Sequence, residues 1–281
     1  MWGVFPLYFK ALAHVSPWRI VCHRILWSAV FLGVIVSLRS EWRWLWPAVR
    51  HARNLGMLVA GGVLIALNWL IFIYAVTTSQ VLEASLGYFI NPLLSVALGM
   101  IFLKERLRTG QWVAVVIAAA AVLNLAWRGE KLPWIALALA GTFGLYGLVR
   151  KKVDLPSLHA LLVETTVLVP VALVGLAWLP TSKPVGVPAG FTFGLLAFTG
   201  VITATPLLFF GAAVRRLKLS TVGFLQYVGP TLQFAVALLA FGEPLDPAKL
   251  ASFGLCWIAI GVYVVDSLLK HAPQPVADRP E

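Results

Sequence analysis

Three ionisable side chains lie inside long apolar stretches of the chain and suggest chemistry there. His23 and Arg24 are adjacent in one stretch, and Glu164 lies in another. Ionisable residues are costly in hydrocarbon and usually face a protein interior or a water-filled path. With no second carboxylate near it in the sequence, a lone buried Glu164 would hold its proton readily, which suits a proton-coupled step. An Arg24–Glu164 ion pair is a second interpretation, and snorkelling of Arg24 to the interface is a third.

Uncharged polar side chains occur in the same kind of stretch. Primary amides need hydrogen-bond partners in an apolar interior, so they mark either a cavity or contacts between helices. We predict a substrate cavity lined by Asn68, Tyr88, Asn91, Glu164, Gln226 and Tyr227. We expect gating or ion-pairing roles for His23, Arg24, Pro92 and Pro230. An interior proline frees a backbone carbonyl and bends a helix, although a plain packing kink is the alternative for both prolines.

No enzyme or cofactor motif accompanies these residues. The sequence holds no GxSxG, HExxH, P-loop or GxGxxG pattern, and Cys22 and Cys256 have no metal-ligand spacing. We therefore expect a protein that is not an enzyme, with no metal and no cofactor. An intramembrane enzyme would need a second catalytic group facing Glu164, and only His23 qualifies.

The elements that must position these side chains are long apolar segments. Of the 281 residues, 60% are hydrophobic and 12% are charged, against about 45–50% and about 25% in soluble proteins. This composition excludes an ordinary soluble enzyme, a disordered chain and, despite a net charge of +11, a nucleic-acid partner. A span needs roughly 20 apolar residues. Ten can be placed, at about 1–15, 17–38, 55–77, 81–103, 110–127, 132–149, 157–179, 188–214, 219–241 and 248–269.

The loops between these spans indicate an orientation. Most of the 22 Lys and Arg residues fall in the loops that lie inside when both termini are cytoplasmic, as the positive-inside rule requires. We therefore predict an all-α, multi-pass protein of the inner membrane, with the lipid bilayer as its first partner. The first span is short, and we expect that it has lost its first turns.

The two halves of the sequence match at a fixed offset of 138 residues. Matched pairs include Tyr8 and Tyr146, Pro92 and Pro230, and Glu105 and Glu243. Each copy holds five spans, and an odd number inserts the second copy upside down. The loop over 104–108 is basic whereas its counterpart over 242–246 is not, which is the charge pattern of opposite insertion.

We therefore predict two inverted five-helix repeats, over residues 1–127 and 128–270, and a cytoplasmic tail over 271–281. Inverted repeats are typical of secondary transporters, whose substrate site lies near the midplane between the halves. Motifs spread over nearly the whole chain resemble the EamA branch of the drug/metabolite transporter superfamily, and within it the RarD-like proteins. They include Trp2-Gly3, His23-Arg24, Leu67-Asn68-Trp69, the run from Glu83 to Leu93, Thr203 to Leu208, and Gln226-Tyr227.

The resemblance implies a secondary transporter and a chloramphenicol-related phenotype, without naming a substrate. Members of the family carry further residues before the Trp-Gly pair, which supports the expected truncation of the first helix. We predict export of a small metabolite or drug-like solute by alternating access, with protons as a coupling ion and a monomer or homodimer as the assembly. A non-transporting receptor or assembly factor is the alternative, and a central polar cavity would distinguish the two.

Overall fold

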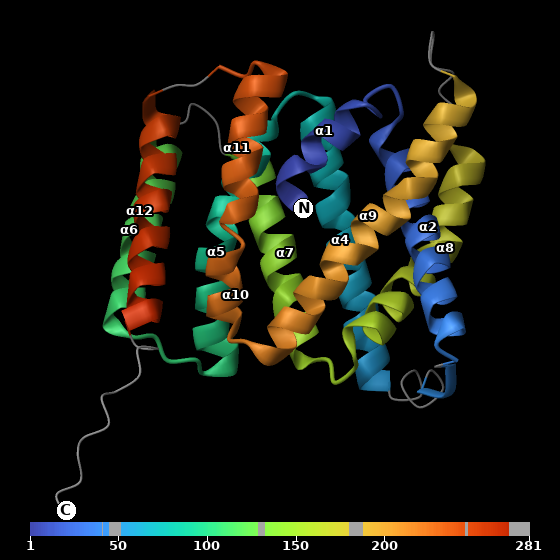
Figure 1. The fold of residues 1–281 in the computed structure, drawn as a ribbon, viewed down its shortest axis with the longest axis horizontal. Helices are drawn as coiled ribbons and strands as arrows, with labels where there is room; N and C mark the ends of the chain where they lie inside the picture. Colours follow the sequence, from blue (N-terminus) through green and yellow to red (C-terminus); the bar gives the residue numbers. More distant parts are fainter. Residues whose placement is uncertain (41, 45–51, 129–132, 180–187, 245–246, 270–281) are drawn as a thin grey trace, which may run out of the picture. The chain divides into compact units, whose positions relative to one another are not determined.

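The computed structural model describes residues 1–40, 42–44, 52–128, 133–179, 188–244 and 247–269. Over these residues the regular structure is helical, with no strand (Figure 1). The helices are η1 (Trp2–Val4), α1 (Phe5–Lys10), α2 (Pro17–Leu38), η2 (Trp42–Trp44), α4 (Ala52–Thr77), α5 (Val81–Leu103), α6 (Thr109–Arg128), α7 (Trp134–Lys152), α8 (Ser157–Trp178), α9 (Ala189–Arg216), α10 (Leu219–Leu225), α11 (Val228–Phe241) and α12 (Pro247–Leu269).

Each predicted span contains a helix in the structure, the first over residues 2–10 only, which confirms the all-α prediction. Ten segments result among the described residues, because η1 with α1 forms the first and α10 with α11 forms the ninth. Six of the ten are long and apolar enough to cross a bilayer. They are α2, α4, α5, α8, α9 and the segment made of α10 and α11.

By its contacts the chain divides into two compact units. The first comprises residues 1–105 and 133–244, and the second comprises 106–132 and 245–281. Each predicted repeat therefore gives its first four spans to the first unit and its fifth span to the second. The compact units and the two halves of the sequence thus divide the chain differently.

The second unit is built on α6 and α12, which pack against each other. Two polar contacts join the helices: Gln111 Nε2 lies 3.3 Å from the Tyr263 hydroxyl, and Asn124 Nδ2 donates to Ser252 Oγ over 2.9 Å. Arg108 also lies 3.1 Å from a carboxylate oxygen of Asp266. The fifth helices of the two repeats are thus paired with each other.

In the first unit, helices of the two repeats alternate. The counterparts α2 and α8 pack together, and α5 packs against both α7 and the α10–α11 segment (Figure 1). Glycine permits the closest approaches. A Cβ on Gly200 of α9 would overlap the backbone of Trp27 in α2, so only glycine fits where these two helices meet.

A reciprocal pair of glutamate caps joins α5 to the α10–α11 segment. Glu105, just beyond the end of α5, accepts hydrogen bonds from the backbone N–H of Leu219 at 2.9 Å and of Ser220 at 3.3 Å. Glu243, just beyond α11, accepts them from Val81 at 2.7 Å and Leu82 at 2.9 Å. Each carboxylate satisfies N–H groups that a helix start leaves unpaired. Both donors and acceptors are related by the offset of 138, so the two inverted repeats meet as equivalents.

The ninth span is interrupted where the sequence places two of the predicted cavity residues. Helix α10 ends at Leu225, Gln226 and Tyr227 form a turn, and α11 resumes at Val228. Its counterpart α5 is continuous through Pro92. The repeats are therefore equivalent in topology but not in local geometry. Broken helices in membrane proteins are tolerated where they are buried in protein or line a cavity.

Candidate substrate cavity

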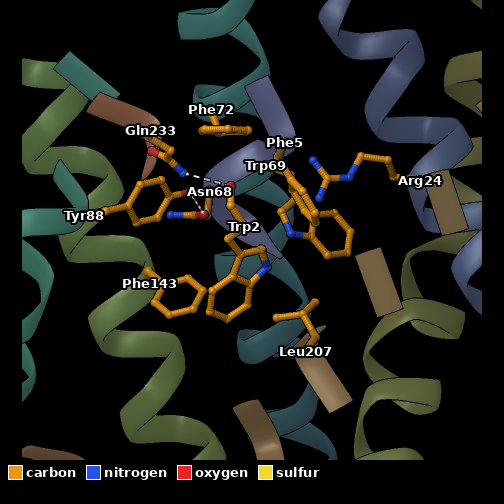
Figure 2. Close-up of a pocket in the computed structure, with 10 residues that line it drawn as sticks. All are labelled: Trp2, Phe5, Arg24, Asn68, Trp69, Phe72, Tyr88, Phe143, Leu207 and Gln233. Atoms are coloured by element: carbon orange, nitrogen blue, oxygen red, sulfur yellow. Dashed lines mark hydrogen bonds between the residues drawn. The ribbon is translucent and has the colours of Figure 1, made fainter. Parts of the chain in front are cut away.

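Side chains from both repeats enclose a narrow cavity inside the first unit (Figure 2). It is lined by Trp2, Phe5, Arg24, Asn68, Trp69, Phe72, Tyr88, Phe143, Leu207 and Gln233. These residues come from η1, α1, α2, α4, α5, α7, α9 and α11. A smaller neighbouring space shares Trp2, Tyr88, Phe143 and Gln233, and adds Gln226, Gly229 and Pro230. The lining includes repeat counterparts, because Phe5 corresponds to Phe143 and Tyr88 to Gln226.

Aromatic rings form most of the wall. In Figure 2 the Trp2 indole lies between Phe143 and Trp69. Its ring meets that of Phe143 edge-on, with centroids 5.4 Å apart, and Tyr88 meets Phe72 in the same way at 5.9 Å. The free space holds roughly two water molecules. A solute of metabolite size therefore enters only if these rings move.

Asn68 and Gln233 bring amides to the wall. Both N–H groups of Asn68 are donated to α7, to the Leu139 carbonyl over 3.0 Å and to Thr142 Oγ1 over 2.9 Å. Its oxygen receives the Tyr88 hydroxyl over 3.4 Å. Gln233 donates to the Trp2 carbonyl over 3.2 Å, while its Oε1 is buried with no partner in the described part of the chain. One amide is thus fixed by its surroundings, and the other keeps a free acceptor.

Arg24 brings a positive charge to the same wall. It is only 2% exposed, and its Nε donates to Thr203 Oγ1 over 2.9 Å. The guanidinium lies over two rings, 4.6 Å from the Trp69 centroid and 4.9 Å from that of Phe9. Its Nη1 is buried and has no hydrogen-bond partner among the described residues.

Comparison with known proteins places the chain in a family. Residues 1–127 match the EamA-like transporter family. The chain is 44% identical to an uncharacterized transporter of Pseudomonas aeruginosa, covering 98% of this chain and 94% of the relative. It is also 44% identical to Protein RarD of Escherichia coli, covering 95% of this chain and 91% of the relative. The chain belongs to the EamA-like transporter family, as a RarD-like member.

A solved crystal structure supports the same fold for this EamA-family protein. That structure is described only as the crystal structure of a protein, and it matches with a TM-score of 0.67 over 95% of this chain and 94% of the other. At 18% identity that likeness concerns the fold alone. The chain is therefore a multi-pass membrane protein built as two inverted five-helix repeats, and it is a member of a transporter family.

In this EamA-family protein, the Arg24–Glu164 ion pair that the sequence suggested is not formed. Glu164 instead pairs with Arg150 at 3.2 Å and accepts the Tyr146 hydroxyl over 3.1 Å. Arg150 Nη2 also donates to the Ser157 carbonyl over 3.3 Å. Glu164 is therefore not a lone buried acid, and it lines neither of the two cavities. The sequence does not reveal this pair, because Arg150 directly follows the predicted span 132–149 and precedes Lys151 and Lys152, so it looks like one of the basic loop residues.

The remaining predicted cavity residues lie beside the broken span. Asn91 donates its amide to Gln226 Oε1 over 2.8 Å, which ties α5 to the turn after α10. Gln226 lines the smaller space, whereas the Tyr227 ring is buried and packs against Phe89. Of the predicted set, Asn68, Tyr88 and Gln226 thus reach a cavity, and Asn91 supports one of them.

The four residues expected to gate or to pair are placed separately. Arg24 lines the larger cavity and Pro230 the smaller one, where the Pro230 carbonyl accepts the Ser85 hydroxyl over 3.0 Å. Pro92 lies within α5 and faces Gly223 of α10, where a Cβ would be 3.1 Å from the Pro92 Cα. His23 is half-buried on α2 and lines neither cavity.

Sequence reasoning also missed several lining residues, chiefly Trp2, Trp69, Phe143 and Gln233. Aromatic residues make up 12% of the chain, and periodicity does not tell which of them face lipid and which face the interior. A usable signal was present, because Phe5 and Phe143 coincide at the repeat offset. Gln233 was visible as an amide in an apolar span.

Proposed function

We propose that this protein is a secondary transporter of the inner membrane, which exports a small metabolite or drug-like solute by alternating access. The observation that supports it best is the cavity shared by both repeats, where Asn68, Tyr88 and Gln233 meet an aromatic wall. Inverted-repeat transporters hold their substrate at such an interface. So narrow a cavity fits a conformation in which the two repeats are closed around the proposed substrate site.

The remaining features of the proposal concern topology and energy. We place both termini in the cytoplasm because the basic loops then lie inside. We keep protons as a proposed coupling ion. Glu164, however, is paired with Arg150 and is not the lone buried acid that would suit a proton-carrying role. The assembly that we propose is a monomer or a homodimer.

A flux screen in proteoliposomes tests the transport proposal. The solutes are offered with and without a pH gradient. They include chloramphenicol, because the family resemblance implies a chloramphenicol-related phenotype. Dependence on the gradient would support proton coupling. Flux of none of them, from protein shown to be folded, would favour the non-transporting alternative.

Variants connect the flux to the cavity. Gln233→Ala removes a buried amide from the wall, and we expect roughly tenfold slower flux, as for the loss of one hydrogen-bonding group. Gln80→Ala is the matched control, because Gln80 precedes α5 and lines neither cavity. Equal slowing by both variants would argue against a substrate path through this cavity.

A further inference from the structure

We propose that the cavity takes a small organic monoanion, a carboxylate with a flat apolar body, and that Arg24 binds its charged group. This inference rests on the proposed function and names the class of solute. It starts from the surroundings of Arg24, which is buried but has no carboxylate paired with it among the described residues.

The positive charge of Arg24 is permanent. Arginine stays protonated in proteins, and a buried charge is costly unless it is paired. Here two aromatic rings and one hydroxyl satisfy it in part. In contrast, Arg150 meets a carboxylate directly in the same unit. The structure thus leaves one guanidinium neutralised within the fold and the other open to an external anion.

The free hydrogen-bonding atoms indicate where the anion binds. Arg24 Nη1 is buried without a hydrogen-bond partner in the part of the chain that the structure describes, and the residue lines the cavity. A guanidinium edge suits a planar carboxylate. Among the described residues Arg24 is the one charged side chain that lines this cavity, so a single negative charge is matched better than the double charge of a phosphate monoester.

The rest of the wall indicates the body of the solute. Trp2, Trp69, Phe72 and Phe143 offer ring faces and edges that suit a flat apolar group. Gln233 Oε1 is an acceptor with no partner among the residues that the structure describes, so it suits a hydroxyl or N–H donor on the solute. A hydroxylated aromatic carboxylate combines all three features.

The charge of such a solute also bears on the direction of transport. A cell interior is electrically negative, so outward movement of a monoanion is favoured by the membrane potential. An exporter of this class could work without coupling each cycle to a proton. The anion proposal therefore gives the proposed export its own source of energy.

Binding to the intact purified protein tests the proposal independently of transport. The probes are 4-hydroxybenzoate, its neutral amide 4-hydroxybenzamide, and phenyl phosphate, with thermal stability and calorimetry as readouts. We expect 4-hydroxybenzoate to bind at least tenfold more tightly than the amide. Equal affinities, or no binding by any probe, would overturn the proposal. Tighter binding of phenyl phosphate would overturn the carboxylate assignment.

Two variants of α2 separate the site from a general charge effect. Arg24→Gln should lose tenfold or more in affinity for 4-hydroxybenzoate and keep its weak affinity for the amide. Arg19→Gln is the matched control, because Arg19 binds the Leu179 carbonyl over 2.8 Å and lines neither cavity. Unchanged binding by a folded Arg24→Gln protein would refute the role of Arg24. If Arg24→Gln does not fold, the selectivity of the natural protein for acid over amide still decides.

A flux measurement distinguishes failure of this inference from failure of the transport proposal. Proteoliposomes loaded with 4-hydroxybenzoate, at a pH well above the pKa of its carboxyl group, are given an inside-negative potential. Faster efflux than at zero potential supports anion export. Selective anion binding without flux would contradict transport and leave the anion site standing, whereas flux of neutral solutes alone would contradict the anion site and leave transport standing.

Discussion

At the scale of single residues, the Glu164–Arg150 pair is held in a tightly packed place. Both side chains are at most 2% exposed. A Cβ on Gly61 would lie 3.1 Å from the Glu164 carboxylate, and one on Gly62 would lie 2.8 Å from the Glu164 backbone oxygen. Such packing leaves little room for water or solute beside the pair. We therefore interpret it as a structural element of the bundle.

Glu164→Gln keeps the shape of the side chain and leaves the Arg150 charge uncompensated. We expect destabilisation of about 3 kcal/mol or more, the range measured when one partner of a buried ion pair is removed. Thermal unfolding in detergent measures it. Asp154→Asn is the control, because Asp154 faces Arg215 at 3.7 Å with a 99% exposed side chain, and we expect no measurable change there. Equal melting of Glu164→Gln and the natural protein would show that the pair contributes little.

Single residues also show what a sequence reveals. Asn68 and Tyr88 could be predicted because polar groups are rare in apolar spans, and the structure brings both to the cavity. The partner of Glu164 could not be predicted, because a cation at the end of a span looks like a loop charge until the orientation of α7 in the bundle is known. Trp2 and Trp69 stand in motifs that carry the family resemblance, but nothing in the sequence placed them on the cavity wall, since aromatic rings suit lipid and interior equally.

At the scale of elements, close helix contacts depend on positions with no room for a side chain. Gly200 brings α9 against the backbone of Trp27 in α2, and Ser28 Oγ donates to the Gly200 carbonyl over 3.3 Å. The ten spans and the duplication were predictable, because hydrophobic length and repeat offset are properties of the sequence. The break between α10 and α11 was not, since its mate α5 runs through the matching residues unbroken.

Gly200→Ala should push α2 and α9 apart, because its new methyl group meets backbone and not a movable side-chain end. We expect destabilisation of about 1–3 kcal/mol, as for overpacking, measured by thermal unfolding. Gly194→Ala on the same helix has no atom of the described residues within 4 Å of the new Cβ, so it should be neutral or stabilising by up to about 1 kcal/mol from helix propensity. Similar losses in both variants would contradict the close-contact interpretation.

At the scale of the whole molecule, the repeat symmetry places one glutamate cap at each end of α5. Glu105 holds the start of α10 beside the end of α5, and Glu243 holds the start of α5 beside the end of α11. The matching of these glutamates was visible in the sequence, but their contacts were not, because contact requires α5 and α11 to run antiparallel as neighbours. In the alternating access that we propose, the two ends would loosen at different times, and each cap would then act as a separate restraint.

Local opening distinguishes two separate restraints from one general stabilising effect. Glu105→Gln removes the charge that the N–H groups of Leu219 and Ser220 face, and we expect roughly tenfold faster amide exchange there, in keeping with loss of a helix cap. Glu243→Gln should do the same at Val81 and Leu82, each variant leaving the opposite end close to the natural rate. Hydrogen exchange followed by mass spectrometry reads both ends in one experiment. Equal acceleration at both ends in either single variant would mean that the caps act on global stability, and that neither end can be released without the other.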